Sequence, residues 1–100
     1  MHVRLIIPGI PDPCSDYLTR VVNIAGGFTT WQGIGGWKDG QGRLIIEPIT
    51  IVEISFDSGG GLSDEVAADR FRHLATDIAK DLRQDCVYLA IDNVVEYVKG

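Results

Sequence analysis

The chain has 100 residues, which predicts a single domain over residues 1–100 and leaves no room for a second. Apolar residues make up 45 % of the chain and charged residues 23 %, a composition that excludes an intrinsically disordered protein. The net charge of −5, from 9 Lys and Arg against 14 Asp and Glu, excludes a general nucleic-acid binder. No apolar run approaches the about 20 residues that a membrane-spanning helix needs, and the first residues lack the apolar segment of a signal peptide. We therefore expect a cytoplasmic protein without a membrane partner.

The first part of the chain predicts a strand over residues 3–7 and a helix over residues 13–25. Asp12 is suited to cap this helix, and Pro13 suits its first position. Apolar residues recur at helical spacing along it, and the Gly26-Gly27 pair supplies the left-handed conformation that ends a helix.

A long hairpin is predicted next. Residues 28–38 are rich in aromatic residues, Thr and Gly, and residues 43–56 are rich in β-branched residues, both of which are typical of strands. The turn between them contains Asp39-Gly40, a strong hairpin pattern. Because Pro48 cannot donate a hydrogen bond to a ladder, we expect it where the hairpin leaves the main sheet or at a bulge.

The second half predicts a glycine-rich loop over residues 57–62, a helix capped by Ser63, a strand over residues 86–91 and a short fifth strand over residues 94–98. The helix carries one continuous apolar stripe, formed by Val66, Ala67, Phe71, Leu74, Ala75, Ile78 and Leu82.

The order strand, helix, strand, strand, helix, strand is typical of an α+β, ferredoxin-like βαββαβ fold. Each helix is apolar on one side only, so we expect both to cover one face of an antiparallel four-stranded sheet, with the short fifth strand added. Right-handed crossovers predict that the first and third strands lie side by side and parallel, with the last strand antiparallel to the first.

Strict alternation along residues 43–56 assigns side chains to the two faces of this sheet. The side toward the helices receives Thr50, Val52, Ile54 and Phe56. The open side receives Glu47, Ile49, Ile51, Glu53 and Ser55. An open face with apolar residues usually meets another subunit or a ligand, so we expect a homo-oligomer, dimer or higher.

Along residues 28–38, Trp31, Gly33, Gly35 and Trp37 share one face. They predict a groove with a floor of bare backbone and walls of indole rings, in which a planar ligand stacks. The alternative is that the glycines mark bulges and the tryptophans pack against a neighbouring element. The predicted ligand-binding residues are Trp31, Gly33, Gly35, Trp37, Arg43 and Glu53.

Glu53 near the middle of a half-buried strand has either a functional role or a structural Arg or Lys partner. His73 has Asp69 and Asp77 four residues to either side, which predicts simple pairing on a solvated helix face. No catalytic triad, metal-ligand spacing or cofactor motif can be built from the chain, so we expect a binding protein rather than an enzyme.

The cysteines, Cys14 and Cys86, match no metal or redox spacing. We expect both to be small, buried or half-buried apolar residues. A thiol pair is the alternative, since Cys14 starts a helix close to the predicted last strand.

One pattern resembles a known group of proteins: Gly26-Gly27-Phe28-Thr29, followed by Gly33, Gly35, Trp37, Gly40, Gly42, Glu47 and Glu53. It is similar to an uncharacterised family of small proteins from bacteria, plasmids and tailed phages. The resemblance spans nearly the whole chain and implies a ferredoxin-like fold, but it carries no established activity and therefore transfers no catalytic residue. A phage setting suggests inhibition of host defence, for example by sequestering nucleotide signals.

The leading hypothesis is a regulatory homo-oligomer that binds or sequesters a small molecule such as a nucleotide, without a metal or cofactor. One alternative is a phage-type inhibitor that binds a host defence protein. The other is an enzyme of the dimeric α+β barrel type, with Glu53 or His73 as the base.

Overall fold

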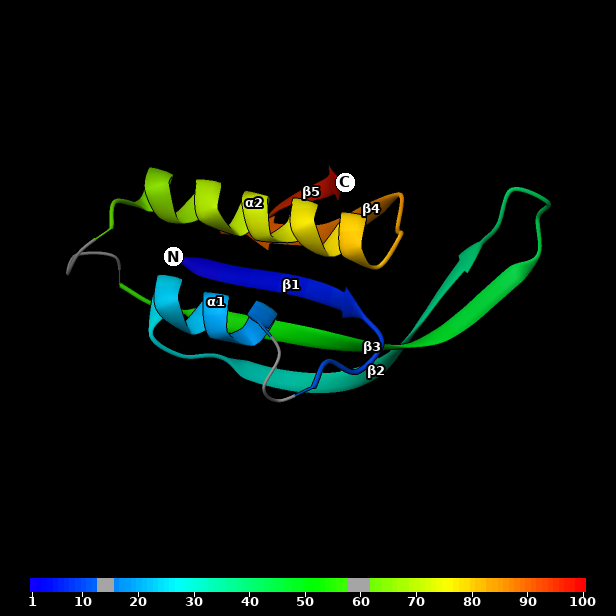
Figure 1. Ribbon diagram of the computed structural model, residues 1–100, viewed down its shortest axis with the longest axis horizontal. Coiled ribbons are helices and arrows are strands. Elements are labelled where there is room, and N and C mark those ends of the chain that lie inside the picture. Colours follow the sequence, from blue (N-terminus) through cyan, green and yellow to red (C-terminus); the bar gives the residue numbers. More distant parts are fainter. Residues whose placement is uncertain (13–15, 58–61) are drawn as a thin grey trace.

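The computed structural model describes residues 1–12, 16–57 and 62–100 (Figure 1). Its elements, in chain order, are β1 (His2–Pro8), α1 (Asp16–Ala25), β2 (Thr29–Lys38), β3 (Leu44–Ser55), α2 (Asp64–Asp81), β4 (Cys86–Ile91) and β5 (Val94–Lys99). Every predicted element is present, and the strand ends differ from the predicted ones by at most one residue. Cys14, the predicted first turn of α1 from Pro13 and most of the predicted 57–62 loop lie outside the described residues.

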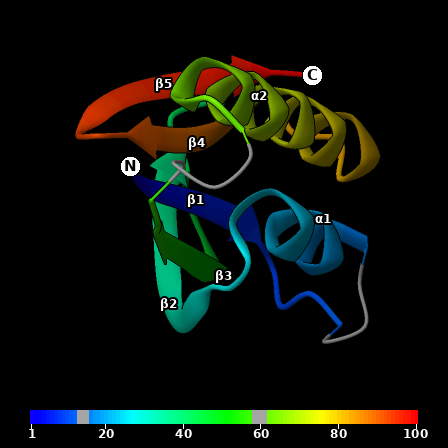
Figure 2. The same ribbon diagram turned by 90° about the vertical axis from the view of Figure 1, so that its left-hand side faces the viewer.

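The five strands form one sheet in the order β2-β3-β1-β4-β5 (Figure 2), and all four neighbouring pairs are antiparallel. The prediction that the first and third strands are parallel is therefore wrong: Leu5 of β1 faces Val52 of β3 in an antiparallel ladder. The reason lies in the connections. Each helical crossover leads to a strand two places away that runs in the same direction, and the hairpin reverses the chain, so β3 enters beside β1 in the opposite direction.

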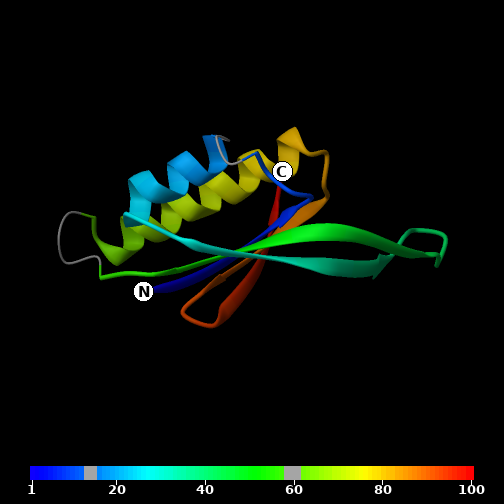
Figure 3. The same cartoon turned by 90° about the horizontal axis from the view of Figure 1, so that it is seen from below.

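Both helices lie on one side of the sheet, and the other side stays bare (Figure 3). Val52 and Ile54 of β3 are buried under the helices, as predicted, with Leu5 of β1 and Phe71 of α2. Each fully buried side chain of this size stabilises the fold by about 1.5–3 kcal/mol. The ends of the predicted α2 stripe are different: Val66 and Leu82 are exposed, while Ala68 and Ala79 are buried.

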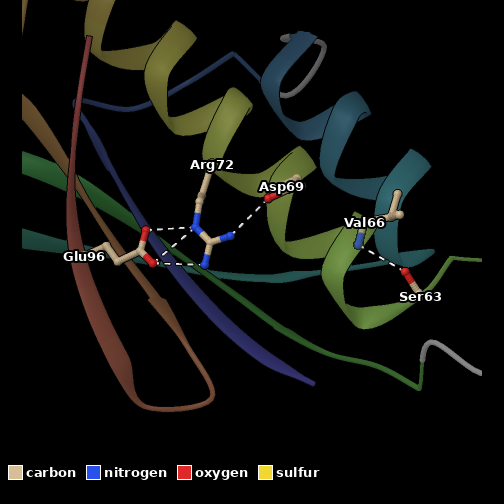
Figure 4. Close-up of polar contacts among 5 residues, drawn as sticks. All are labelled: Ser63, Val66, Asp69, Arg72 and Glu96. Carbon is tan, nitrogen blue, oxygen red and sulfur yellow. Dashed lines mark hydrogen bonds and ion pairs between the residues drawn. The ribbon is translucent and has the colours of Figure 1, made fainter.

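The ends of the helices are set by local hydrogen bonds. The Ser63 hydroxyl accepts a 3.2 Å hydrogen bond from the backbone N–H of Val66 (Figure 4), which confirms Ser63 as the N-cap of α2. Gly26 ends α1 with φ +86, and its N–H donates to the carbonyl of Val22 at 2.7 Å.

Arg72 of α2 ties the edge strand β5 to the helical layer (Figure 4). Its Nε and Nη2 each donate a 3.0 Å hydrogen bond to the Glu96 carboxylate, and its Nη1 lies 3.2 Å from Asp69 Oδ1. The hydrogen bond to Glu96 raises the pKa of Arg72 above its ordinary value. This bidentate contact holds β5 against α2, and β5 has a ladder partner on one side only.

The β2–β3 hairpin is longer than the rest of the sheet and projects beyond it (Figure 1). The last pairing of β1 is Pro8 with Ile49, and we call the free part, residues 34–48, the hairpin arm. Pro48 pairs with Ile34 in an unbroken register, so Pro48 marks the place where the arm leaves the sheet and not a bulge.

Neither helix in the described parts of the chain is long and apolar enough to cross a membrane.

Candidate functional site

The bare side of the sheet, which we call the open face, carries side chains from all five strands. Ile49 and Ile51 belong to it, as predicted. Antiparallel partners point to the same side, so their ladder partners Gly33 and Trp31 lie on the open face as well. The same rule adds residues from the other strands, and the face includes Arg4, Ile6, Trp37, Glu47, Glu53, Tyr88 and Tyr97.

The predicted glycine groove lies on the open face, but its floor is not bare backbone. A Cβ atom added at Gly35 would lie 2.9 Å from Ile49 Cγ2, and one added at Gly33 would lie 3.7 Å from Ile49 Cγ1. The Ile49 side chain therefore lies across both glycines and supplies an apolar floor. The close approach of this β-branched side chain is what requires glycine at position 35.

A pocket of about 440 Å³ lies where the hairpin arm leaves the open face. Trp37 lines it from the arm, and Tyr88 and Tyr97 line it from β4 and β5. The two tyrosine rings meet edge to face, with centroids 5.9 Å apart and an interplanar angle of 76°. Ile6 and Ile49 add aliphatic surface. The pocket therefore presents three aromatic side chains over an aliphatic floor.

The charged groups of this pocket are of one sign. Its lining includes the carboxylates of Glu47 and Asp85, and no Lys or Arg of the described chain lines it. Within the described residues, Glu47 has no hydrogen bond or ion pair to another side chain. Unpaired carboxylates beside aromatic faces attract cations and repel anions.

Glu53 lies on the open face away from this pocket, and its structural partner is Arg4. Arg4 Nε donates a 2.7 Å hydrogen bond to Glu53 Oε1, and Arg4 Nη2 also contacts this oxygen. The hydrogen bond to Glu53 raises the pKa of Arg4 above its ordinary value. Of the two roles predicted for Glu53, the structural ion pair is the one that the structure shows. Arg4 also lines a smaller pocket of about 250 Å³, with His2 and Tyr88.

Arg43 lies at the turn of the hairpin arm, outside the pocket lining. Its Nε donates a 2.9 Å hydrogen bond to Asp39 Oδ2, and its side chain is 70 % exposed. The backbone N–H groups of Arg43 and Gln41 donate to Asp39 Oδ1 and lower the pKa of Asp39. Arg43 therefore stabilises the turn with Asp39.

The six predicted binding residues thus separate into three groups. Gly35 and Trp37 line the pocket, whereas Trp31, Gly33 and Glu53 share the open face without lining it, and Arg43 lies elsewhere. The prediction missed Tyr88 and Tyr97. Val87 and Leu89 of β4 are buried, so strand alternation places Tyr88 between them on the open face. The same alternation in the sequence could have predicted Tyr88 as a residue of this face.

Two other predictions need correction. Cys86 is exposed and free, because it begins β4 at the rim of the sheet. Asp69 and Asp77 form ion pairs with Arg72 and Arg20, and neither pairs with His73. No group of metal-ligating side chains occurs in the part of the chain that the structure describes.

Two solved structures share this fold. A phage SAM lyase in complex with S-methyl-5'-thioadenosine superposes with a TM-score of 0.72 at 15 % identity, covering 99 % of this chain and 88 % of that one. A phage SAM lyase in the apo state gives 0.70 at 16 % identity, with the same coverage. No family model and no curated protein matches the chain. The likeness shows a common α+β architecture of two helices on an antiparallel sheet.

The contact between Gly35 and Ile49 predicts an asymmetry between two glycines on the same face. The substitution Gly35→Ala should lower the free energy of unfolding by about 1–3 kcal/mol, because the added methyl group overlaps Ile49 Cγ2. Gly33→Ala is the matched control and should change it by less than about 1 kcal/mol, since its contacts are ordinary ones. Urea denaturation measures both, and equal losses would contradict the account of the floor.

Proposed function

We propose that this protein binds an adenosine thioether or the corresponding sulfonium, the ligand class of S-methyl-5'-thioadenosine and SAM, in the open-face pocket. The observation that carries this proposal is one pocket that combines three aromatic side chains with two carboxylates and, among the described residues, no basic side chain. Its volume of about 440 Å³ is typical of small-molecule sites, which span about 300–1,000 Å³.

Each part of such a ligand has a matching surface in the pocket. A purine ring is planar and stacks on aromatic side chains such as Trp37 and Tyr97, which are 41 % and 67 % exposed. A positively charged sulfonium is attracted by aromatic faces and by the Glu47 carboxylate. A nucleotide phosphate is disfavoured, because Glu47 and Asp85 repel it without a compensating cation in the lining. The proposal therefore narrows the expected nucleotide to an adenosine derivative without phosphate.

The likeness to the phage SAM lyases supports the same ligand class, since one of them was solved with S-methyl-5'-thioadenosine. On the strand order β2-β3-β1-β4 of the first four strands, we also assign the βαββαβ part of the chain to the ferredoxin-like class, with β5 as an addition at the edge.

Self-association is part of the proposal. On the side of the hairpin arm that continues the helix-covered face, Ile34, Leu44 and Ile46 are 78 %, 67 % and 62 % exposed. A two-stranded ribbon is marginally stable on its own, and a contiguous exposed apolar patch marks an interaction site. A second copy of the chain would cover this patch, so the protein acts as a homo-oligomer. The inhibitor and barrel-enzyme hypotheses remain predictions.

The two tryptophans give a matched test of the site. Trp37→Ala should weaken binding of S-methyl-5'-thioadenosine at least about fivefold, because each stacked base contributes about 1–3 kcal/mol. Trp31→Ala removes an equally large and similarly exposed side chain from the same face, outside the pocket lining, and should leave the affinity unchanged. Isothermal titration calorimetry measures both. Equal losses, or no binding by the unmodified protein, would refute the assignment.

Glu47 gives a test of charge recognition. Glu47→Gln should weaken binding of the sulfonium SAM by about fivefold while leaving the uncharged S-methyl-5'-thioadenosine unaffected, because only the former loses an ion attraction. Glu65→Gln on α2 makes the same chemical change on the helical side and serves as the control. Competition titrations compare the two ligands. An equal loss of affinity for both ligands would show that Glu47 shapes the pocket and does not recognise the positive charge of the sulfonium.

A further inference from the structure

The two helices lie on the side of the sheet opposite to the open face (Figure 3), and polar contacts join them along a seam. At one end of the seam the Tyr17 hydroxyl donates a 2.8 Å hydrogen bond to Asp81 Oδ2. One turn further along α1, Arg20 Nη1 lies 2.8 Å from Asp77 Oδ2. The contacts move toward the end of α1, from Tyr17 to Arg20, and toward the start of α2, from Asp81 to Asp77. The helices are therefore antiparallel, and each of these two turns pairs a donor with a carboxylate.

The next turn breaks this pattern. Asn23 and Ile24 of α1 are there opposite Arg70 and His73 of α2. A cleft of about 210 Å³ separates them, and Arg20 lines the same cleft from the preceding turn. No carboxylate lines it within the described chain. The position that the pattern gives to an acid, four residues before Asp77, is occupied by His73.

The side chains that line the cleft have hydrogen-bond donors without a partner in the described part of the chain. Arg70 and His73 have no hydrogen bond or ion pair within the described residues, and the nearby Asp69 is bound by Arg72. Arg20 uses Nη1 for Asp77, and its guanidinium has further N–H groups. In a chain with a net charge of −5, a cleft lined by two arginines and a histidine, with no carboxylate of the described residues in its lining, is a local concentration of hydrogen-bond donors.

We propose that the cleft between α1 and α2 binds a tetrahedral oxyanion of the phosphate class, held by Arg20, Arg70 and His73 with the Asn23 amide as a further donor. Guanidinium groups present N–H donors in a geometry that matches phosphate oxygens, and the anion supplies the negative charge that this turn of the seam lacks. The sheet separates this cleft from the open-face pocket. Binding of phosphate in the cleft therefore does not depend on the proposed adenosine site.

Inorganic phosphate is the probe that tests this proposal. Phosphate is titrated into the uniformly ¹⁵N-labelled protein at constant ionic strength, with sodium chloride as the exchanged salt. We expect saturable amide shifts centred on Asn23, Arg70 and His73. Shifts that fail to saturate, or that centre elsewhere, would overturn the proposal. Acetate at equal concentration separates the anion classes, and an equal response to acetate would overturn the tetrahedral preference.

Two variants and one control complete the test. Arg70→Gln should raise the apparent Kd for phosphate about tenfold, because it removes a charge-assisted hydrogen bond. Asn23→Asp changes the shape of the cleft very little, adds a negative charge and should abolish the saturable response. Arg83→Gln removes an exposed arginine beyond the end of α2 and should leave the Kd unchanged. If Arg70→Gln and Arg83→Gln changed the Kd equally, the response would be explained by general charge screening and the proposal would be overturned. The spectra report the folded state of each variant.

Discussion

The rest of the structure depends on one asymmetry: two helices bury one face of a five-stranded sheet and leave the other face without cover. Along β1 and β3, alternate residues such as Leu5 and Val52 have no exposed surface, because they lie under α1 and α2. The intervening residues, among them Ile6 and Ile51, fall on the opposite side by the geometry of a strand. Among the described residues no further element covers that side, so the apolar surface there is available to a ligand or to another chain.

The hairpin arm forms a pocket on this bare surface. The arm extends β2 and β3 beyond β1 and carries Trp37 and Glu47 to the edge of the open face, where Tyr88 and Tyr97 lie. Glycine at position 35 lets the Ile49 side chain lie flat across the arm. The carboxylates of the open face differ in their pairing. Arg4 neutralises Glu53 in the middle of the sheet, whereas Glu47 at the pocket has no partner among the described residues. The pocket is therefore aromatic and acidic.

Local pattern was enough to predict the elements and the faces of β2 and β3. The Ser63 cap and the Gly26 stop both follow from short-range chemistry. The site was harder, because it depends on which strands become neighbours. Tyr88 reaches the pocket only through the antiparallel order β1-β4-β5, and Arg43, close to the tryptophans in sequence, is carried to the far end of the hairpin arm. Pairing between elements distant in the chain decided the place of Tyr88, and the mistaken parallel pairing of β1 and β3 shares that origin. The place of Arg43 follows from the local hairpin turn, where it contacts Asp39.

The central claim is that the open face of the sheet holds an adenosine thioether and that a second copy of the chain covers the exposed apolar patch of the hairpin arm. Native mass spectrometry of the full chain with S-methyl-5'-thioadenosine measures both parts in one spectrum. The account predicts an assembly of two or more chains that carries up to one ligand per chain and retains it under gentle activation. A spectrum in which no species gains the mass of the ligand, at concentrations that saturate a micromolar site, would contradict it.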